Sequence, residues 1–224
     1  MGAGSSDADG FSADDRRFMA RALDLARGQL GRTSPNPAVG CVIVRDGVAI
    51  AEGATGDGGR PHAEELALEA AGEHAEGATA YVTLEPCNQR SGGAFACSQL
   101  LLGSGVARVV IACSDPHPLG AHGANRLTAS GVIVETGLMR ADAEALNAGF
   151  FKHVATGRPW LAIDADASTY DGEFSLLANE TLEAALDRFG AKGWTRAFAR
   201  PGTALAAQLS ARGLVDADPA ATRK

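Results

Sequence analysis

Short apolar runs alternate along this chain with segments whose apolar positions recur every three or four residues. The apolar runs are typical of buried strands, and the wider spacing is typical of amphipathic helices. Strands are therefore predicted at residues 39–44, 49–51, 78–84, 108–112 and 132–135. Helices are predicted at residues 12–28, 63–70, 96–102, 124–130 and 140–155, and Ser12 can cap the first of them. This alternation predicts an α/β fold with helices layered on the faces of a sheet.

The pattern changes after Pro159. Strands are predicted at residues 160–165 and 195–198, and helices at residues 181–190 and 204–212. This segment of roughly 65 residues is too short for a typical enzyme domain. At the other end, residues 1–12 are rich in Gly, Ser and Asp, and we expect a disordered tail there. The expected organisation is therefore a tail at 1–12, a main domain at 13–157 and a small segment at 158–224.

Charge and cysteine content narrow the function classes. The formal net charge is −7, which argues against a general nucleic-acid surface because such a surface needs a basic face. No apolar run approaches the roughly 20 residues of a membrane span, and the N-terminus has no signal-peptide pattern. The four cysteines fit a reducing cytoplasm better than a disulfide framework. Cys41 and Cys113 lie in apolar runs, and we expect them to pack in the core.

Two short stretches carry candidate chemistry. Pro61-His62-Ala63-Glu64 opens a helical segment, and Pro86-Cys87 follows a strand, with nine residues between Cys87 and Cys97. One imidazole and two thiolates leave the fourth position of a tetrahedral zinc open for water, as in catalytic rather than structural sites. A structural zinc, or a buried cluster without metal, is the alternative interpretation.

Glu64 lies two residues after His62, at the entrance to its helix. It can therefore lie near a metal without being a ligand, which is the position of a proton-shuttling carboxylate. The alternative is a first-turn charge that favours the helix dipole. His-x-Glu followed by Pro-Cys and a second Cys is the layout of zinc deaminases that act on bases, although the gap between the cysteines is longer here.

Further motifs accompany this layout. They are Gly31-Arg-Thr-Ser-Pro-Asn-Pro-Ala-Val-Gly-Cys-Val-Ile-Val44, Tyr81-Val-Thr-Leu-Glu-Pro-Cys-Asn88, Asp115-Pro116 and Leu146-Asn147-Ala-Gly-Phe150. With them, the stretch from about Phe18 to Gly157 resembles the pyrimidine deaminase domain of riboflavin biosynthesis, a member of the cytidine-deaminase-like zinc superfamily. The Thr-Ser-Pro-Asn-Pro loop separates this family from tRNA, cytidine and guanine deaminases.

The resemblance implies a three-layer α/β/α arrangement around a mixed sheet, and removal of the ring amino group of a diaminopyrimidinone that carries ribose phosphate. It implies one zinc ion per chain, held by His62, Cys87 and Cys97, with Glu64 as proton shuttle. The residues expected at the substrate are Asn36, Thr55, Gln89, Asp115 and His117, together with Arg90, a loop arginine that could bind the substrate phosphate. Taken singly, Asn36 could be a turn former, Arg90 a solvated loop residue and Asp115 a turn residue.

This chain departs from the family pattern around the substrate. Thr55 and Gln89 stand where the family usually has His, and His117 stands where it usually has Asn. The loop from Ser91 to Phe95 replaces a stretch with Thr-Pro-Pro. Because the metal set is kept, we expect the family's chemistry with a changed substrate range. One version is a duplicated copy that serves a secondary metabolite such as an azapteridine.

The C-terminal segment resembles parts of the reductase domain that often follows this deaminase. Residues 157–168 resemble its opening strand, with Asp164 where Lys is expected, and residues 182–216 resemble its final cofactor loop and helix. The middle of that domain is missing, and Ala199-Arg200-Pro201 replaces Glu-Gly-Gly. We therefore expect residues 158–224 to be a small, non-catalytic α/β remnant that binds no NADPH.

The expected partner is a small-molecule pyrimidine, without nucleic acid or membrane, and the expected assembly is a homodimer in the cytoplasm. Two alternatives stay open. One is a deaminase of another base or of a nucleic acid, and the other is a non-catalytic scaffold that retains zinc for stability.

Overall fold

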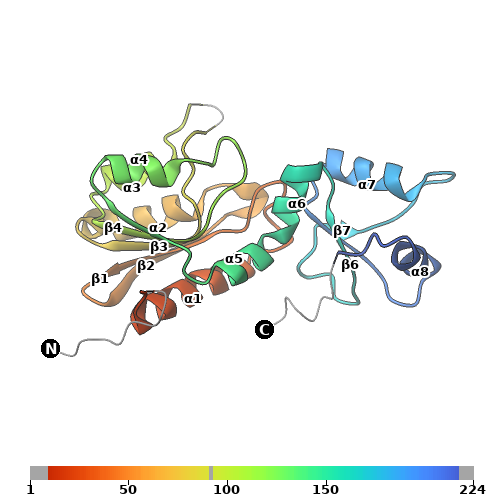
Figure 1. Ribbon diagram of the computed structural model, residues 1–224, viewed down its shortest axis with the longest axis horizontal. Coiled ribbons are helices and arrows are strands. Elements are labelled where there is room, and N and C mark those ends of the chain that lie inside the picture. The colour runs from red at the N-terminus through yellow and green to blue at the C-terminus, as the bar shows by residue number, and fades with distance from the viewer. Residues whose placement is uncertain (1–9, 91–92, 217–224) are drawn as a thin grey trace. The chain divides into compact units, whose positions relative to one another are not determined.

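The computed structural model describes residues 10–90 and 93–216, which form two compact units (Figure 1). The first unit takes in the chain up to residue 28, residues 39–56 and residues 61–144. The second unit takes in residues 29–38, residues 57–60 and the chain from residue 145 onward. The tail predicted at residues 1–12 lies outside the described residues as far as residue 9. Phe11 is buried, so the packed chain begins before the predicted boundary.

The first unit is built on a mixed five-stranded sheet in the order β2-β1-β3-β4-β5. Its strands are β1 (Gly40–Arg45), β2 (Val48–Ala54), β3 (Thr79–Leu84), β4 (Arg108–Cys113) and β5 (Ile133–Thr136). Strand β1 is antiparallel to both β2 and β3, whereas β3, β4 and β5 are parallel to one another. The carboxyl ends of β2, β3, β4 and β5 therefore share one edge of the sheet.

Helices cover both faces of this sheet, which confirms the layered α/β prediction. They are α1 (Ala13–Arg27), α2 (Ala63–Ala71), α3 (Cys97–Gly103), α4 (Gly123–Ala129) and α5 (Arg140–Leu146), with a short 3-10 turn at Gly72–Ala75. A Cβ atom at Gly40 would lie 1.9 Å from the Ala22 carbonyl oxygen in α1, and one at Gly53 would lie 2.2 Å from that of Ala63 in α2.

The strand register then decides which face each helix covers. Gly40 pairs with Ala54, and the next residue, Cys41, pairs with Gly53. Successive residues of a strand point to opposite faces, so Gly40 and Gly53 do as well. Helices α1 and α2 therefore pack on opposite faces, and α3 and α4 lie on the side of α2 (Figure 1).

The N-terminus of α1 has the predicted cap. The Asp15 N–H donates to Ser12 Oγ at 3.1 Å, and the Ser12 N–H donates to Asp15 Oδ2 at 2.9 Å. The other carboxylate oxygen of Asp15 accepts hydrogen bonds from Tyr81 at 2.7 Å and from Arg108 at 2.6 Å. Asp15 thus accepts a backbone hydrogen bond at the start of α1 and links this helix to β3 and β4.

The helix predicted at residues 140–155 is in fact two helices, so that prediction was wrong. Helix α5 ends at Leu146 and α6 (Ala148–Thr156) follows Asn147, whose φ and ψ are −96° and 15°. Asn147 is 2% exposed; its Oδ1 accepts from the Ala38 N–H at 3.1 Å and its Nδ2 donates to the Ala38 carbonyl at 3.0 Å. The break lets one side chain satisfy both buried backbone groups of a residue in the second unit.

The second unit contains a parallel three-stranded sheet in the order β6-β8-β7. Its elements besides α6 are β6 (Trp160–Ile163), β7 (Gly172–Glu173), α7 (Leu182–Ala191), β8 (Arg196–Ala199), α8 (Ala204–Ala211) and a 3-10 turn at Asp57–Gly59. A core of its own includes Leu161, Phe174, Leu186, Phe189 and Leu209. Strand β7 was not predicted, because two residues give no recognisable pattern.

Strand β6 ends two residues before its predicted end at residue 165. The carboxylate of Asp164 accepts from the Asp166 N–H at 3.0 Å and from the Tyr170 hydroxyl at 2.8 Å. These bonds turn the chain away from the strand direction. In the part of the chain that the structure describes, no helix is long and apolar enough to cross a membrane.

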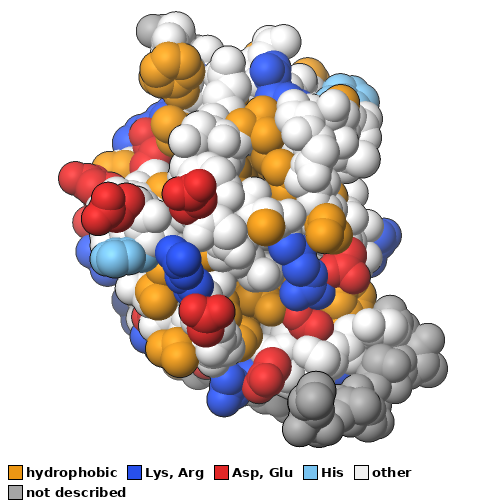
Figure 2. Space-filling view, turned by 90° about the vertical axis from the view of Figure 1, so that its left-hand side faces the viewer, with side chains coloured by type: hydrophobic (Ala, Val, Ile, Leu, Met, Phe, Trp, Pro, Cys, Tyr) orange, Lys and Arg blue, Asp and Glu red, His pale blue; other side chains and the backbone are white. Residues whose placement is uncertain are grey.

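Basic and acidic side chains are interspersed on the face drawn in Figure 2, and Lys and Arg form no continuous patch there. This distribution agrees with the acidic net charge of −7. The face drawn therefore lacks the basic stripe that a nucleic-acid surface needs.

Candidate metal centre

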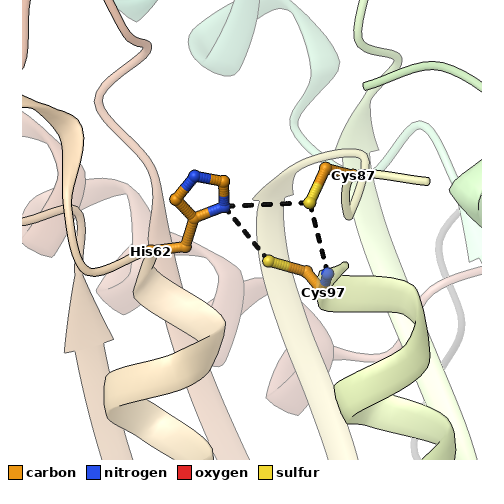
Figure 3. Close-up of side chains that lie close together, drawn as sticks. All are labelled: His62, Cys87 and Cys97. Carbon is orange, nitrogen blue, oxygen red and sulfur yellow. Dashed lines mark hydrogen bonds between the residues drawn. The ribbon is translucent and has the colours of Figure 1, made fainter. Parts of the chain in front are cut away.

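Three potential metal ligands meet at the edge of the sheet where β3 ends (Figure 3). His62 is the residue that precedes α2, Cys97 is the first residue of α3, and Cys87 lies in the loop after β3. Their ligand atoms all lie within 4.8 Å of one another. His62 Nδ1 is 3.2 Å from Cys97 Sγ and 3.8 Å from Cys87 Sγ. The structure therefore brings together all three residues of the predicted metal set.

These distances suit a tetrahedral zinc ion. With Zn–N near 2.0 Å and Zn–S near 2.3 Å, two ligands of such an ion lie about 3.5 to 3.8 Å apart. The Cys97 N–H also donates to Cys87 Sγ at 3.2 Å, which orients that sulfur. One nitrogen and two sulfur donors are a typical zinc set and leave one position for a further ligand.

The two cysteines perturb each other's ionisation. A hydrogen bond from the Cys97 thiol lowers the pKa of Cys87, and the neighbouring His62 lowers it further. The same hydrogen bond, together with burial, raises the pKa of Cys97. The thiolate is therefore favoured at Cys87, which is the form that binds a metal.

Glu64 lies beside this cluster without being one of its three donors. It is the second residue of α2 and is only 3% exposed. Burial raises the pKa of its carboxyl group, while the neighbouring His62 and a hydrogen bond with Cys97 oppose that rise. A buried carboxyl group with a raised pKa binds a proton more readily than an exposed one, which suits a proton acceptor beside the donor cluster.

The loops after β3 and β4 run side by side next to Cys87. The Asn88 N–H donates to the Gly120 carbonyl at 3.2 Å, and the Gln89 N–H donates to the Leu119 carbonyl at 3.0 Å. Gly123 allows α4 to approach, because a Cβ there would lie 1.7 Å from the Pro86 carbonyl oxygen. These contacts place Gln89 on a loop adjoining that of Asp115 and His117.

Asp115 and His117 contact each other directly. The His117 N–H donates to Asp115 Oδ1 at 2.8 Å. Burial raises the pKa of Asp115 to about 6, and the nearby Glu85 and Cys87 contribute to the rise. Asp115 is thus a partly buried carboxyl group that interacts electrostatically with the metal-binding residue Cys87, and its contact with a substrate stays a prediction.

Thr55 and Asn36 have protein partners that account for their positions. Thr55 is buried; its Oγ1 accepts from the Val39 N–H at 3.0 Å and lies 3.4 Å from the Val39 carbonyl oxygen. Asn36 belongs to the second unit, where its Nδ2 donates to the Gly58 carbonyl at 3.2 Å. Their contacts with a substrate stay predictions.

Arg90 has a partner that the sequence did not indicate. It forms a two-pronged ion pair with Glu65, the residue after Glu64. Glu65 also accepts a hydrogen bond from the His62 N–H at 2.7 Å. The spacing of a helix N-cap and a Glu three residues later could have identified Glu65, but His is an unusual N-cap residue. Beyond Arg90, Ser91 and Gly92 lie outside the described residues.

Several known proteins are similar to this chain in sequence and in fold. Residues 12–113 match the family described as the cytidine and deoxycytidylate deaminase zinc-binding region. Riboflavin biosynthesis protein RibD of Escherichia coli is 47% identical over 168 residues, which cover 75% of this chain and 45% of that protein. The diaminohydroxyphosphoribosylamino-pyrimidine deaminase of Buchnera aphidicola is 44% identical over 147 residues, which cover 65% of this chain and 99% of that protein.

Solved structures extend the likeness. RibD of Acinetobacter baumannii has a TM-score of 0.77 and 27% identity, covering 91% of this chain and 85% of that chain. A Thermotoga maritima structure, titled as a diaminohydroxyphosphoribosylaminopyrimidine deaminase and uracil reductase, has a TM-score of 0.79 and 22% identity, covering 89% of this chain and 84% of that chain. The second likeness concerns the fold alone.

Proposed function

This chain belongs to the riboflavin-biosynthesis pyrimidine deaminases of the cytidine-deaminase-like superfamily, and we propose that it hydrolytically deaminates a diaminopyrimidinone ribose phosphate with the help of zinc. The match spans less than half of the length of the E. coli relative. The observation that carries the proposal is the His62, Cys87 and Cys97 cluster with the buried Glu64 beside it.

The division of labour follows from these residues. A zinc ion held by His62, Cys87 and Cys97 would activate a water molecule for attack on the ring carbon that bears the amino group. Glu64 would accept a proton from that water and deliver it to the ring nitrogen. It would then take the proton of the hydroxyl group added to the ring carbon and pass it to the departing amine, as the C–N bond breaks and a carbonyl forms. Overall, the substrate and one water molecule are converted to the pyrimidinedione and ammonia.

Substrate recognition is assigned to the loops next to Cys87. We propose that Gln89, Asp115 and His117 contact the substrate, because they lie on two adjoining loops beside the metal ligands. Phe95 is 70% exposed, and the sequence from Ser91 to Phe95 contains no proline that would fix a backbone φ angle. Because this loop differs from that of the family, we propose a changed substrate range. A duplicated deaminase that serves a secondary metabolite would have such a range.

The decisive experiment is an ammonia-release assay with purified protein. The substrates are the diaminopyrimidinone ribotide, its dephosphorylated riboside, cytidine, guanine and a tRNA stem-loop. The expected result is the highest kcat/KM on the ribotide or riboside, with turnover lost on zinc removal. Preference for cytidine, guanine or RNA would contradict the proposal, and zinc binding without turnover on any substrate would favour a scaffold.

We propose that the second unit has no reductase activity of its own. Its sheet has three strands, with a central β8 that leads into Ala199, Arg200 and Pro201. Without a glycine pair there, a phosphate cannot approach the backbone closely. Calorimetry with NADPH tests this, since saturable binding would contradict it. Light scattering on the purified protein would test the expected homodimer.

A further inference from the structure

Arg90 and Glu65 form an ion pair against the donor cluster. Arg90 Nη1 is 2.7 Å from Glu65 Oε1, and Arg90 Nη2 is 2.5 Å from Glu65 Oε2. The Arg90 side chain is 4% exposed and that of Glu65 is 29% exposed. The pair is therefore largely withdrawn from solvent, unlike the exposed ion pairs that contribute little to stability.

The same two residues contact two of the three metal-binding residues. Glu65 Oε2, which accepts from Arg90, also accepts from the His62 N–H at 2.7 Å. Arg90 Nη2 lies 3.9 Å from Cys97 Sγ. A single guanidinium and a single carboxylate thus link the backbone of His62 to the sulfur of Cys97. Residues that contact the metal ligands without binding the metal themselves set the orientation of those ligands and strongly affect metal affinity.

The position of Arg90 in the chain adds a second reason. Arg90 is three residues after Cys87, in the loop that leads to Cys97 through Gly93. Its ion pair with Glu65 therefore anchors the chain near Cys87 to helix α2. A planar guanidinium suits this role, since it binds both carboxylate oxygens at once, whereas a lysine ammonium is a point charge.

We propose that Arg90 is a positioning residue of the metal centre. It acts through Glu65 on His62 and directly on Cys97, and so keeps these two residues oriented for metal binding. The inference rests on the proposed zinc site. It assigns Arg90 to the metal side of the site rather than to the substrate phosphate.

The test compares the zinc affinity of Arg90→Gln with that of the wild-type protein, using competition with a chromophoric chelator. The expected result is a 10- to 100-fold weaker affinity, the range typical of lost outer partners. Arg90→Lys should recover only part of it, because it cannot bind Glu65 through two nitrogens. In the cobalt-substituted protein, the sulfur-to-cobalt absorption band should shift, which a purely structural role would not cause. Arg21→Gln is the matched control, because Arg21 makes an equally two-pronged but exposed pair with Glu52.

Kinetics separate this role from phosphate binding. For Arg90→Gln, kcat should fall by a similar factor on the ribotide and on the riboside, with little change in either KM. Zinc affinity within twofold of wild type, or a KM increase confined to the ribotide, would overturn the inference. If Arg90→Gln fails to fold, Glu65→Gln serves instead, since it can still accept from the His62 N–H and should weaken zinc binding in the same direction. A wild-type protein that binds no zinc would instead refute the proposed function itself.

Discussion

His62 Nδ1 and Cys97 Sγ lie 3.2 Å apart although the residues are 35 positions apart in the chain. Each residue stands at the start of a helix, His62 before α2 and Cys97 at the first position of α3 (Figure 3). Helices α2 and α3 pack against each other on one face of the sheet. Two of the three donors are therefore positioned by packed helices, whereas Cys87 lies in the loop after β3.

Cys87→Ser should remove zinc and deaminase activity together, because a hydroxyl group is a much poorer zinc ligand than a thiolate. Metal analysis of the purified variant and an ammonia assay measure the two losses. Cys113→Ser is the matched control, since Cys113 is buried and donates to the Thr83 carbonyl at 3.3 Å, away from the three donors. Retention of stoichiometric zinc by Cys87→Ser would contradict the assignment.

Glu64→Gln should keep zinc but lower kcat by about 10²-fold or more, because the amide cannot carry the proton between water and the ring nitrogen. Zinc content and steady-state kinetics on the same preparation separate binding from catalysis. Glu69→Gln, an exposed change on the same helix, should leave both unchanged. Near-normal turnover in Glu64→Gln would refute the role of Glu64.

Asp115→Asn should stabilise the protein in a pH-dependent way. Burial raises the pKa of Asp115 from 3.8 to about 6, so its ionised form is less favourable in the folded state. This penalty is absent below about pH 4, grows as the pH rises and is complete above about pH 6. A shift of about two pKa units corresponds to at most about 3 kcal/mol.

Urea denaturation at pH 4 and at pH 8 measures this effect. Asp115→Asn should raise the free energy of unfolding at pH 8 and change it little at pH 4. Asp46→Asn is the control, because the Asp46 side chain is 95% exposed, and it should have a small effect at either pH. An equal effect of Asp115→Asn at both pH values would contradict the prediction.

Asn147→Ala should destabilise the second unit by about 2 to 5 kcal/mol, because it leaves both the N–H and the carbonyl of Ala38 without their partner. Chemical denaturation measures the change in unfolding free energy. Asn125→Ala, an exposed change in α4, provides the comparison and should change stability by less than about 0.5 kcal/mol. A similarly small effect at Asn147 would show that the helix break has another cause.

Local patterns predicted those features that a few neighbouring residues decide. The strands of the first unit, the cap at Ser12 and the burial of Cys41 and Cys113 were confirmed. The metal set was also predictable, because His62, Cys87 and Cys97 lie in short motifs whose residue types suit zinc. The predicted helix across Asn147 was wrong, because the partner that favours the break, Ala38, lies 109 positions away.

By itself the sequence determined the order of elements, the donor types and the family, since each depends on spacing within one segment or on a contiguous motif. Tertiary structure alone decided that Arg90 binds Glu65 and contacts Cys97, and that residues 29–38 pack with the second unit. The physical reason is that contacts between distant residues depend on strand register and helix packing. Those are set by the burial and hydrogen bonding of the whole unit, which no local pattern encodes.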